Sequence, residues 1–137
     1  MIRILLDTNV YISAILFNGK PRLILEDIIE ERVNAYISND ILKELEDTLS
    51  KPKFKLTTDF IQIVLSEIRD ITRLVNTTPL NNYLDLRDRN DFHILEAAFS
   101  AKVDYLITGD KDLLSLKKIR EFKIINPEDY LRIKGED

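Results

Sequence analysis

Near its N-terminus the chain reads Ile4-Leu5-Leu6-Asp7-Thr8-Asn9-Val10, an apolar run that ends in a carboxylate. The apolar run, which begins at Ile2, is too short for a signal-peptide core, and its continuous hydrophobic character is typical of a strand buried on both faces. A helical pattern from Asn9 to Phe17 follows at once. Asp7 is therefore predicted to lie where a buried strand ends and a helix begins.

The rest of the chain repeats this alternation. Short apolar runs predict four more strands, at Ala35–Ile37, Arg73–Val75, Tyr105–Ile107 and Lys123–Ile125. Helices are predicted at Asn9–Phe17, Pro21–Glu31, Asn39–Leu49 (with Ser38 as its N-cap), Thr58–Ile71 and Asn90–Ala101, and a short last one after Asn126-Pro127. Strands joined through helices pair in parallel by right-handed crossovers. We therefore expect a three-layer α/β/α sandwich with a central, mostly parallel five-stranded sheet and a functional crevice at the carboxyl ends of the strands.

Length and composition indicate one globular domain. The chain has 137 residues, 45% hydrophobic and 32% charged, and we expect a single domain over residues 1–133 and a polar tail over residues 134–137. It has no cysteine, which excludes disulfides, thiol catalysis and thiolate metal sites. No apolar stretch approaches the roughly 20 residues of a membrane helix, and no export signal is recognisable, so we expect a cytoplasmic protein.

Four carboxylates are predicted to meet at one edge of the sheet. Asp7 and Asp110 each follow a predicted strand, while Glu44 and Asp91 border the buried stripes of their helices. Acids packed together without Lys or Arg are stable at neutral pH chiefly when cations neutralise them, and oxygen ligands suit Mg²⁺ or Mn²⁺. Phosphodiester hydrolysis is the chemistry such a site favours. Taken singly, each acid is more simply a helix cap, a helix-start charge or a solvated side chain.

Four ordered blocks of sequence then carry a resemblance to the PIN-domain family, close to VapC-like ribonucleases that act as toxins of toxin–antitoxin systems. The blocks cover nearly the whole chain, and they are Ile4 to Val10, Ser38 to Leu45, Arg87 to Leu95 and Leu106 to Leu114. The resemblance implies a parallel sheet flanked by helices, Mg²⁺ or Mn²⁺ as cofactor, RNA as substrate, a homodimer and a cognate antitoxin protein. It implies the activity of a metal-dependent endoribonuclease.

The resemblance also assigns roles to residues. Asp7, Glu44 and Asp91 match the family's three acidic positions and Asp110 the fourth, so these four are the expected catalytic residues and metal ligands. The expected residues that orient the carboxylates are Asn9, Thr108 and the less regular Asp112. Asn90 stands where many relatives carry another acid, which leaves Asp88 as an alternative ligand to Asp91. Asn9 and Thr108 are equally consistent with helix or turn capping.

Charge gives a weaker indication of the substrate. The net charge is −4, whereas proteins that bind nucleic acid through phosphates are usually basic, although bound divalent cations would offset the acids. The candidate RNA contacts are Lys51, Lys53 and Lys55 in a basic loop, and Arg87 and Arg89 beside Asp91. Such charges are often only solvated surface. His93, the single histidine, is expected to lie on the helix surface or to be partly packed, and not to act as a general base.

Other functions are less consistent with the sequence. A phosphoacceptor receiver domain needs an Asp at the end of a central strand, and the middle strand here ends Val75-Asn76-Thr77. Haloacid-dehalogenase-type phosphatases need Asp-x-Asp after the first strand, where this chain has Asp7-Thr8-Asn9. Two alternatives stay open: a PIN-type module that binds RNA or protein without cutting, and a nuclease for DNA or a structured flap.

Overall fold

The structure is a computed structural model that describes residues 1–78, 90–119 and 121–135, without the side chains of Asn90, Asp91 and Lys118. Among these residues, no helix combines the length and the apolar character that crossing a membrane requires. The candidate residues Arg87 and Arg89 and the alternative ligand Asp88 lie outside the described residues.

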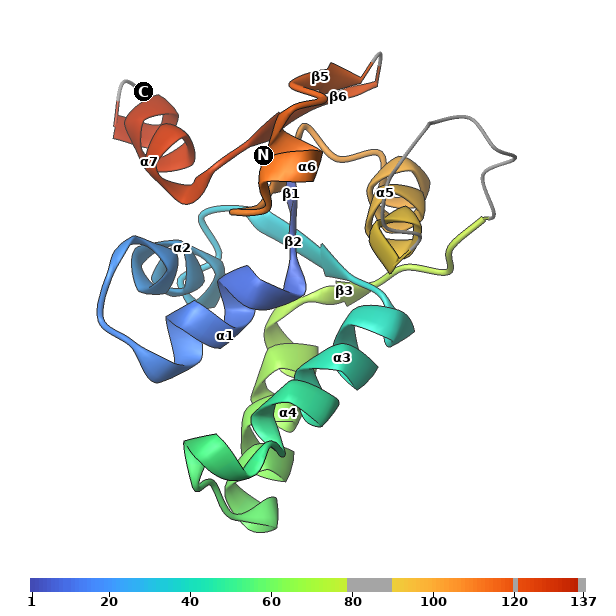
Figure 1. Ribbon diagram of the computed structural model, residues 1–137. Coiled ribbons are helices and arrows are strands. Elements are labelled where there is room, and N and C mark those ends of the chain that lie inside the picture. The colour runs from blue at the N-terminus through green and yellow to red at the C-terminus, as the bar shows by residue number, and fades with distance from the viewer. Residues whose placement is uncertain (79–89, 120, 136–137) are drawn as a thin grey trace.

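The predicted parallel sheet is confirmed. Its strands are β1 (Arg3–Leu6), β2 (Asn34–Ile37), β3 (Arg73–Leu74), β4 (Tyr105–Ile107), β5 (Lys118–Ile119) and β6 (Phe122–Ile125). They lie in the order β3-β2-β1-β4-β6-β5, and every neighbouring pair is parallel except β5 with β6 (Figure 1). The five predicted strands thus form the parallel part, and β5 is an additional short antiparallel strand at the edge that the sequence analysis missed.

Helices connect the strands much as predicted. They are α1 (Thr8–Leu16), α2 (Lys20–Ile29), α3 (Asn39–Leu49), the 3₁₀ turn η1 (Pro52–Phe54), α4 (Thr58–Ile71), α5 (Asn90–Ala101), α6 (Lys111–Leu114) and α7 (Pro127–Gly135). The predicted cap of α3 is confirmed, because Ser38 Oγ accepts a hydrogen bond from the Ile41 backbone N–H at 3.1 Å. Helix α7 runs to Gly135, so Lys134, expected in a polar tail, is helical.

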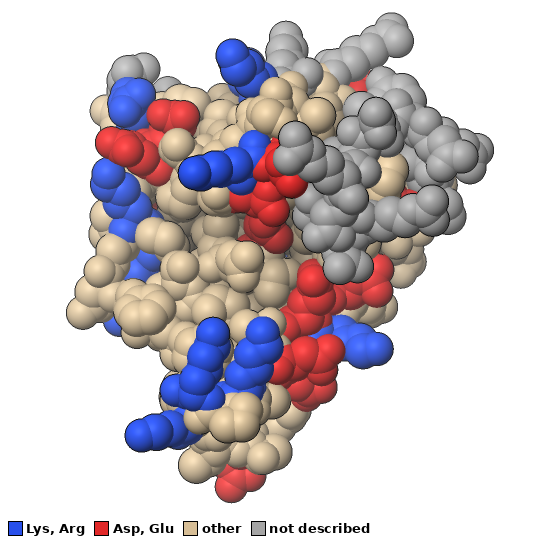
Figure 2. All heavy atoms as spheres, viewed as in Figure 1, with Lys and Arg blue, Asp and Glu red and all other residues tan. Residues whose placement is uncertain are grey.

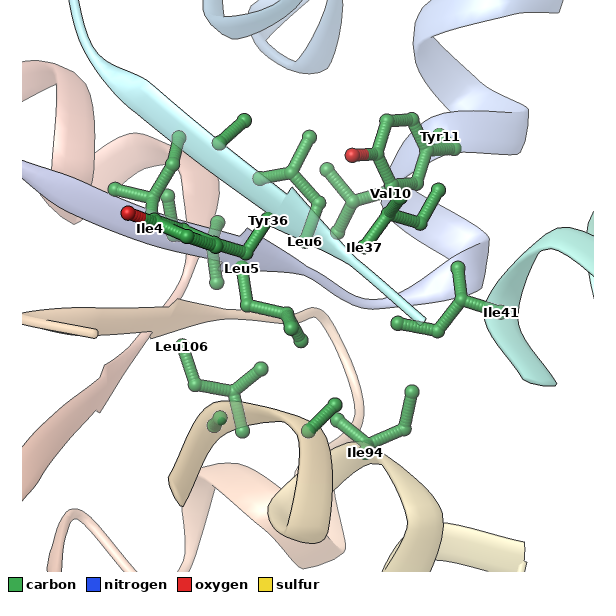
Figure 3. Close-up of a cluster of buried hydrophobic side chains, with 14 of the residues drawn as sticks. Ile4, Leu5, Leu6, Val10, Tyr11, Tyr36, Ile37, Ile41, Ile94 and Leu106 are labelled. Carbon is green, nitrogen blue, oxygen red and sulfur yellow. The ribbon is translucent and has the colours of Figure 1, made fainter. Parts of the chain in front are cut away.

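The core forms two apolar layers, one on each face of the sheet. Successive residues of β1 point to opposite faces. Leu5 lies on the same side as Ile94 of α5, while Leu6 points toward Val10 and Tyr11 of α1 (Figure 3). These five side chains are at most 3% exposed. Helices therefore cover both faces, which confirms the three-layer sandwich.

The strand order places a topological switch point between β1 and β4. From β1 the chain continues outward to β2 and β3, whereas β4 lies on the other side of β1 and is followed by β6. Connections that leave two adjacent parallel strands in opposite directions open a crevice at their carboxyl ends. Asp7 follows β1 and Asp110 follows β4 shortly after, so both belong to this crevice.

Candidate functional site

Asp7 is held tightly at the switch point between β1 and β4. It is the N-cap of α1, and its side chain is among the buried polar groups, 9% exposed. Its Oδ1 accepts a hydrogen bond from the Thr8 backbone N–H and its Oδ2 accepts one from Thr108 Oγ1, both at 2.7 Å. Its own N–H donates to the Ile107 carbonyl at 3.0 Å, which continues the β1–β4 pairing. The orientation of this carboxylate is therefore fixed by the ends of two strands.

Thr108 connects Asp7 to Asp110. Its side chain is fully buried, and the Oγ1 that donates to Asp7 also accepts from the Asp110 backbone N–H at 3.0 Å. Asp110 Oδ1 in turn accepts from the backbone N–H groups of Asp112 at 2.7 Å and Leu113 at 3.3 Å, which caps α6. Thr108 thus contacts both Asp7 and the backbone of Asp110, while Asp112 contributes its backbone N–H to Asp110.

Glu44 approaches the same place from α3. Its Oε1 accepts a hydrogen bond from Thr8 Oγ1 at 3.0 Å and lies 2.7 Å from His93 Nε2 of α5. Thr8 therefore joins the first two acids, through its backbone N–H to Asp7 and through its hydroxyl to Glu44. The sequence analysis missed the contacts of Thr8 and His93. A threonine beside a motif aspartate is the only sequence signal for Thr8, and none points to the His93 contact, which depends on how α3 and α5 pack.

The electrostatics show that these acids affect one another. Burial is the main cause that raises the pKa of Asp7, and the negative charges of Asp110 and Glu44 raise it further. The hydrogen bonds from Thr108 and Thr8 act in the opposite direction and lower the pKa of Asp7. The structure therefore brings Asp7, Asp110 and Glu44 into one electrostatic neighbourhood in which a second negative charge is unfavourable.

The other predicted residues are placed less centrally. Asp91 is in the first turn of α5, but its side chain lies outside the part of the chain that is described. Asn9 is exposed on α1. Acidic side chains gather over α6 and α3 in Figure 2, and basic ones gather over the C-terminal end of α3 and η1. The exposed basic loop residues there are Lys51, Lys53 and Lys55.

The donor set matches a divalent cation in chemistry. Carboxylate oxygens are the ligands that Mg²⁺ and Mn²⁺ prefer, and a cation would offset the unfavourable charge on Asp7. In the described residues no Lys or Arg forms an ion pair with Asp7, Glu44 or Asp110. No group of three His, Asp or Glu side chains among the described residues is close enough to be a complete ligand set. Asp91 is the remaining predicted ligand.

Comparison with known proteins gives matches to a family model, to a curated protein and to a solved structure. A model of the PIN domain matches residues 3–112, a span that includes Asp7, Glu44, Asp91 and Asp110. The uncharacterized protein MJ1680 of Methanocaldococcus jannaschii is 35% identical over an alignment of 129 positions that covers 91% of this chain and 81% of the relative. The crystal structure of PAE2754 from Pyrobaculum aerophilum superposes with a TM-score of 0.63 at 18% identity, covering 99% of this chain and 98% of that one.

Proposed function

Because this chain belongs to the PIN-domain family, which generally includes nucleases, we propose that it is a metal-dependent endoribonuclease that hydrolyses RNA phosphodiester bonds. The observation that carries the proposal is the buried Asp7 at the switch point, with Asp110 and Glu44 close enough to raise its pKa. Asp7 and Asp110 stabilise α1 and α6 as caps, but their mutual proximity is unfavourable when they are ionised. A bound cation would offset this unfavourable charge.

In the proposed site, Asp7, Glu44, Asp91 and Asp110 hold Mg²⁺ or Mn²⁺. When bound, the ion supplies Lewis acidity toward the phosphoryl oxygens and activates water. The chain's own contribution is orientation, since Thr108 fixes Asp7 and the Asp110 backbone at once. The apolar layer below, formed by Leu6 and its neighbours, keeps this arrangement rigid.

The basic loop after α3 supports RNA as the substrate. Lys51 follows Glu44 by seven residues, which is roughly 10 Å at the rise of a helix, so a strand cut near Glu44 passes the loop a few nucleotides away. Lys51, Lys53 and Lys55 are exposed and can pair with its phosphates. We propose the same role for Arg87 and Arg89, which adjoin Asp91 in the sequence.

We further propose that the enzyme works in the cytoplasm as the toxin of a toxin–antitoxin pair, as a homodimer that a cognate antitoxin protein silences. An apolar groove of about 510 Å³ supports a protein partner, because it lies between α1, α2 and α4, and the exposed Ile29 and Phe60 line it. Size-exclusion chromatography with light scattering tests the dimer, and co-expression with the neighbouring open reading frame tests the antitoxin.

A non-catalytic PIN-type module that binds RNA or protein is the second candidate. The family match shows the fold and does not by itself require turnover. Cleavage separates the two candidates, because a binding module holds RNA without turnover in any metal.

The test is cleavage of labelled structured RNAs by purified protein with Mg²⁺ or Mn²⁺, against EDTA and against Asp7→Asn. Asp129→Asn is the matched control, because Asp129 is an acid of α7 that pairs with Arg132 on the surface. We expect metal-dependent cutting by wild type and the control and none by Asp7→Asn. Equal cutting by all three would indicate a contaminant, and RNA binding without cutting would favour the binding module.

A further inference from the structure

His93 makes a contact that its expected role does not explain. It lies on α5 two residues after Asp91, its side chain is 18% exposed, and its Nε2 is 2.7 Å from Glu44 Oε1 on α3. Its Nδ1 is buried and has no hydrogen-bond partner among the described residues. The imidazole therefore makes its one described polar contact with a predicted metal ligand.

The chemistry of the two groups fixes which atom donates. A carboxylate only accepts hydrogen bonds, so His93 Nε2 must carry the hydrogen. Thr8 Oγ1 donates to the same Oε1 at 3.0 Å, so this oxygen receives two hydrogen bonds from two different elements. No described residue hydrogen-bonds to the other oxygen, Oε2. Within the described part of the chain, Glu44 is thus held through one oxygen, Oε1.

We propose that His93 is a positioning residue for the metal site: it orients Glu44 and, by tying α5 to α3, sets the spacing between Glu44 and Asp91. The inference rests on the proposed function. Glu44 is 43% exposed, and a glutamate so exposed samples several rotamers unless contacts restrict it. The contacts from Thr8 and His93 restrict it before a cation arrives, so the cation meets ligands that are already in place.

The first experiment is spectroscopic and uses the fact that the chain contains a single histidine. In ¹⁵N-labelled protein, a long-range ¹H–¹⁵N correlation spectrum reports which ring nitrogen carries the hydrogen. We expect the Nε2–H form with a low-field, slowly exchanging Nε2 proton, both unchanged on addition of Mg²⁺, and loss of the low-field shift and of the slow exchange in Glu44→Ala. An Nδ1–H form would overturn the proposal. Loss of the Nε2 hydrogen with Mg²⁺ would also overturn it, because Nε2 would then be a ligand and not a donor.

The second experiment compares two substitutions of His93 by the calorimetric affinity for Mn²⁺. His93→Leu keeps most of the apolar bulk and removes the donor, and it should weaken Mn²⁺ binding about 10- to 100-fold. His93→Gln can place an amide N–H near the position of Nε2, and it should bind close to wild type. Rescue by Gln but not by Leu is a result that a merely space-filling role of His93 would not produce.

The outcomes separate this proposal from the proposed function. Wild type that neither binds Mn²⁺ nor cuts RNA overturns the proposed function and this inference with it. Wild type that does both, with His93→Leu binding Mn²⁺ equally well, overturns only the role of His93. If His93→Leu does not fold, His93→Gln and the wild-type spectrum still decide, because a Gln variant that binds Mn²⁺ 10- to 100-fold more weakly also overturns the proposed N–H contact.

Discussion

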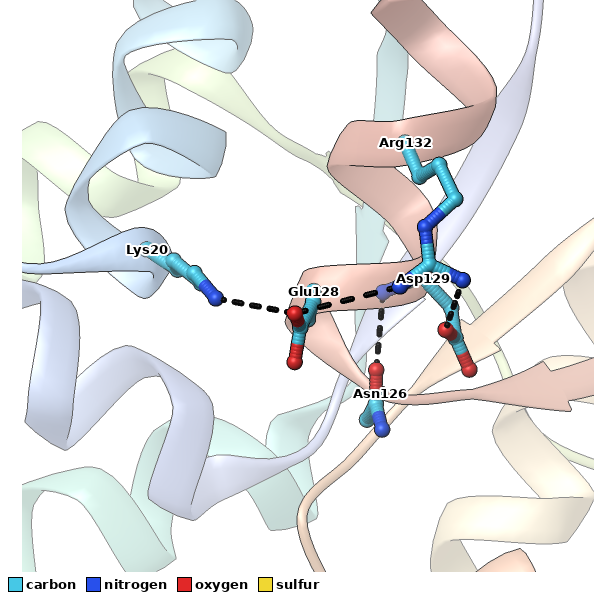
Figure 4. Close-up of polar contacts among 5 residues, drawn as sticks. All are labelled: Lys20, Asn126, Glu128, Asp129 and Arg132. Carbon is cyan, nitrogen blue, oxygen red and sulfur yellow. Dashed lines mark hydrogen bonds and ion pairs between the residues drawn. The ribbon is translucent and has the colours of Figure 1, made fainter.

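Acidic side chains occur in two regions of this molecule under opposite conditions. On the surface between α2 and α7, Glu128 lies 3.3 Å from Lys20 and 3.8 Å from Arg132, and Asp129 lies 3.3 Å from Arg132 (Figure 4). At the carboxyl ends of the strands, Asp7 is 9% exposed, and its described partners are a hydroxyl and a backbone N–H. One region pairs its acids with bases in water, and the other buries an acid next to further acids.

The acidic residues of the two regions require different explanations. An exposed ion pair is worth between zero and about 1 kcal/mol, and its acids require no explanation beyond local electrostatics. Burial of a carboxylate whose neighbours raise its pKa reduces the stability of the folded chain. Local rules of stability are most often broken at functional sites. The loss of stability caused by burying Asp7 therefore points to a function, whereas the ion pairs of α7 do not.

The largest expected difference between the two regions is in the rate of RNA cleavage after one carboxylate of each is neutralised. Glu44→Gln should lower the rate of RNA cleavage by roughly 100- to 10,000-fold, because several kcal/mol of transition-state stabilisation depend on the cation that the carboxylates hold. Glu128→Gln should leave the rate close to wild type, since Glu128 contacts only surface bases in the structure. Initial rates on one labelled RNA measure both. A similar loss in both variants would remove the distinction between the two regions.

A divalent cation should stabilise the protein only through the acids at the carboxyl ends of the strands. Mn²⁺ at 100 times its Kd should raise the free energy of unfolding by roughly 2.7 kcal/mol. Thermal or urea unfolding measures this gain, which Asp7→Asn should remove and Asp129→Asn should keep. A gain that survives in Asp7→Asn would place the cation elsewhere.

The raised pKa of Asp7 predicts how the free energy of unfolding changes with pH. Burial raises the pKa of Asp7 in the folded chain above its unfolded value. Its contribution to stability is therefore complete below the unfolded pKa and is lost as pH rises through the folded pKa. In EDTA, the free energy of unfolding of wild type minus that of Asp7→Asn should fall as pH rises over this range. A difference that grows with pH would mean that the ionised form is the stabilised one.

Much of the fold could be predicted because its signals are local. Continuous apolar runs mark the parallel strands, and caps such as Ser38 mark where α3 begins. The edge strand Lys118–Ile119 was missed because the charged Lys117 and Lys118 interrupt the apolar pattern there. Only its antiparallel pairing with β6, a tertiary contact, makes it a strand.

For the candidate site, too, only part of the arrangement could be predicted from the sequence. The nearness of Asp7 and Asp110 follows from chain order, because both come after neighbouring parallel strands. The contact of His93 with Glu44 could not be predicted, because it depends on the relative position of α3 and α5, which periodicity does not give. The roles of Asp7, Glu44, Asp91 and Asp110 as ligands stay predictions.

A smaller effect should come from the buried hydroxyl that connects the two strand ends. Thr108→Val removes the donor to Asp7 and the acceptor for the Asp110 N–H, and it should cost about 1–3 kcal/mol of unfolding free energy. It should also raise the pKa of Asp7 further, since the Thr108 bond lowers it. Thr108→Ser keeps the hydroxyl and is the control in urea unfolding. Equal stability of the Val and Ser variants would contradict this account.

The smallest effect should come from the surface pair of Lys20 and Glu128, whose side chains are 54% and 58% exposed. Glu128 also lies near Arg132, so a single substitution does not isolate the pair, and a double-mutant cycle with Lys20→Ala and Glu128→Ala is required. We expect a coupling of about 0.2–1 kcal/mol that shrinks as salt is added. A coupling as large as the Thr108 effect would contradict the distinction between the two regions, because a solvated pair would then contribute as much to stability as a buried contact at the candidate site.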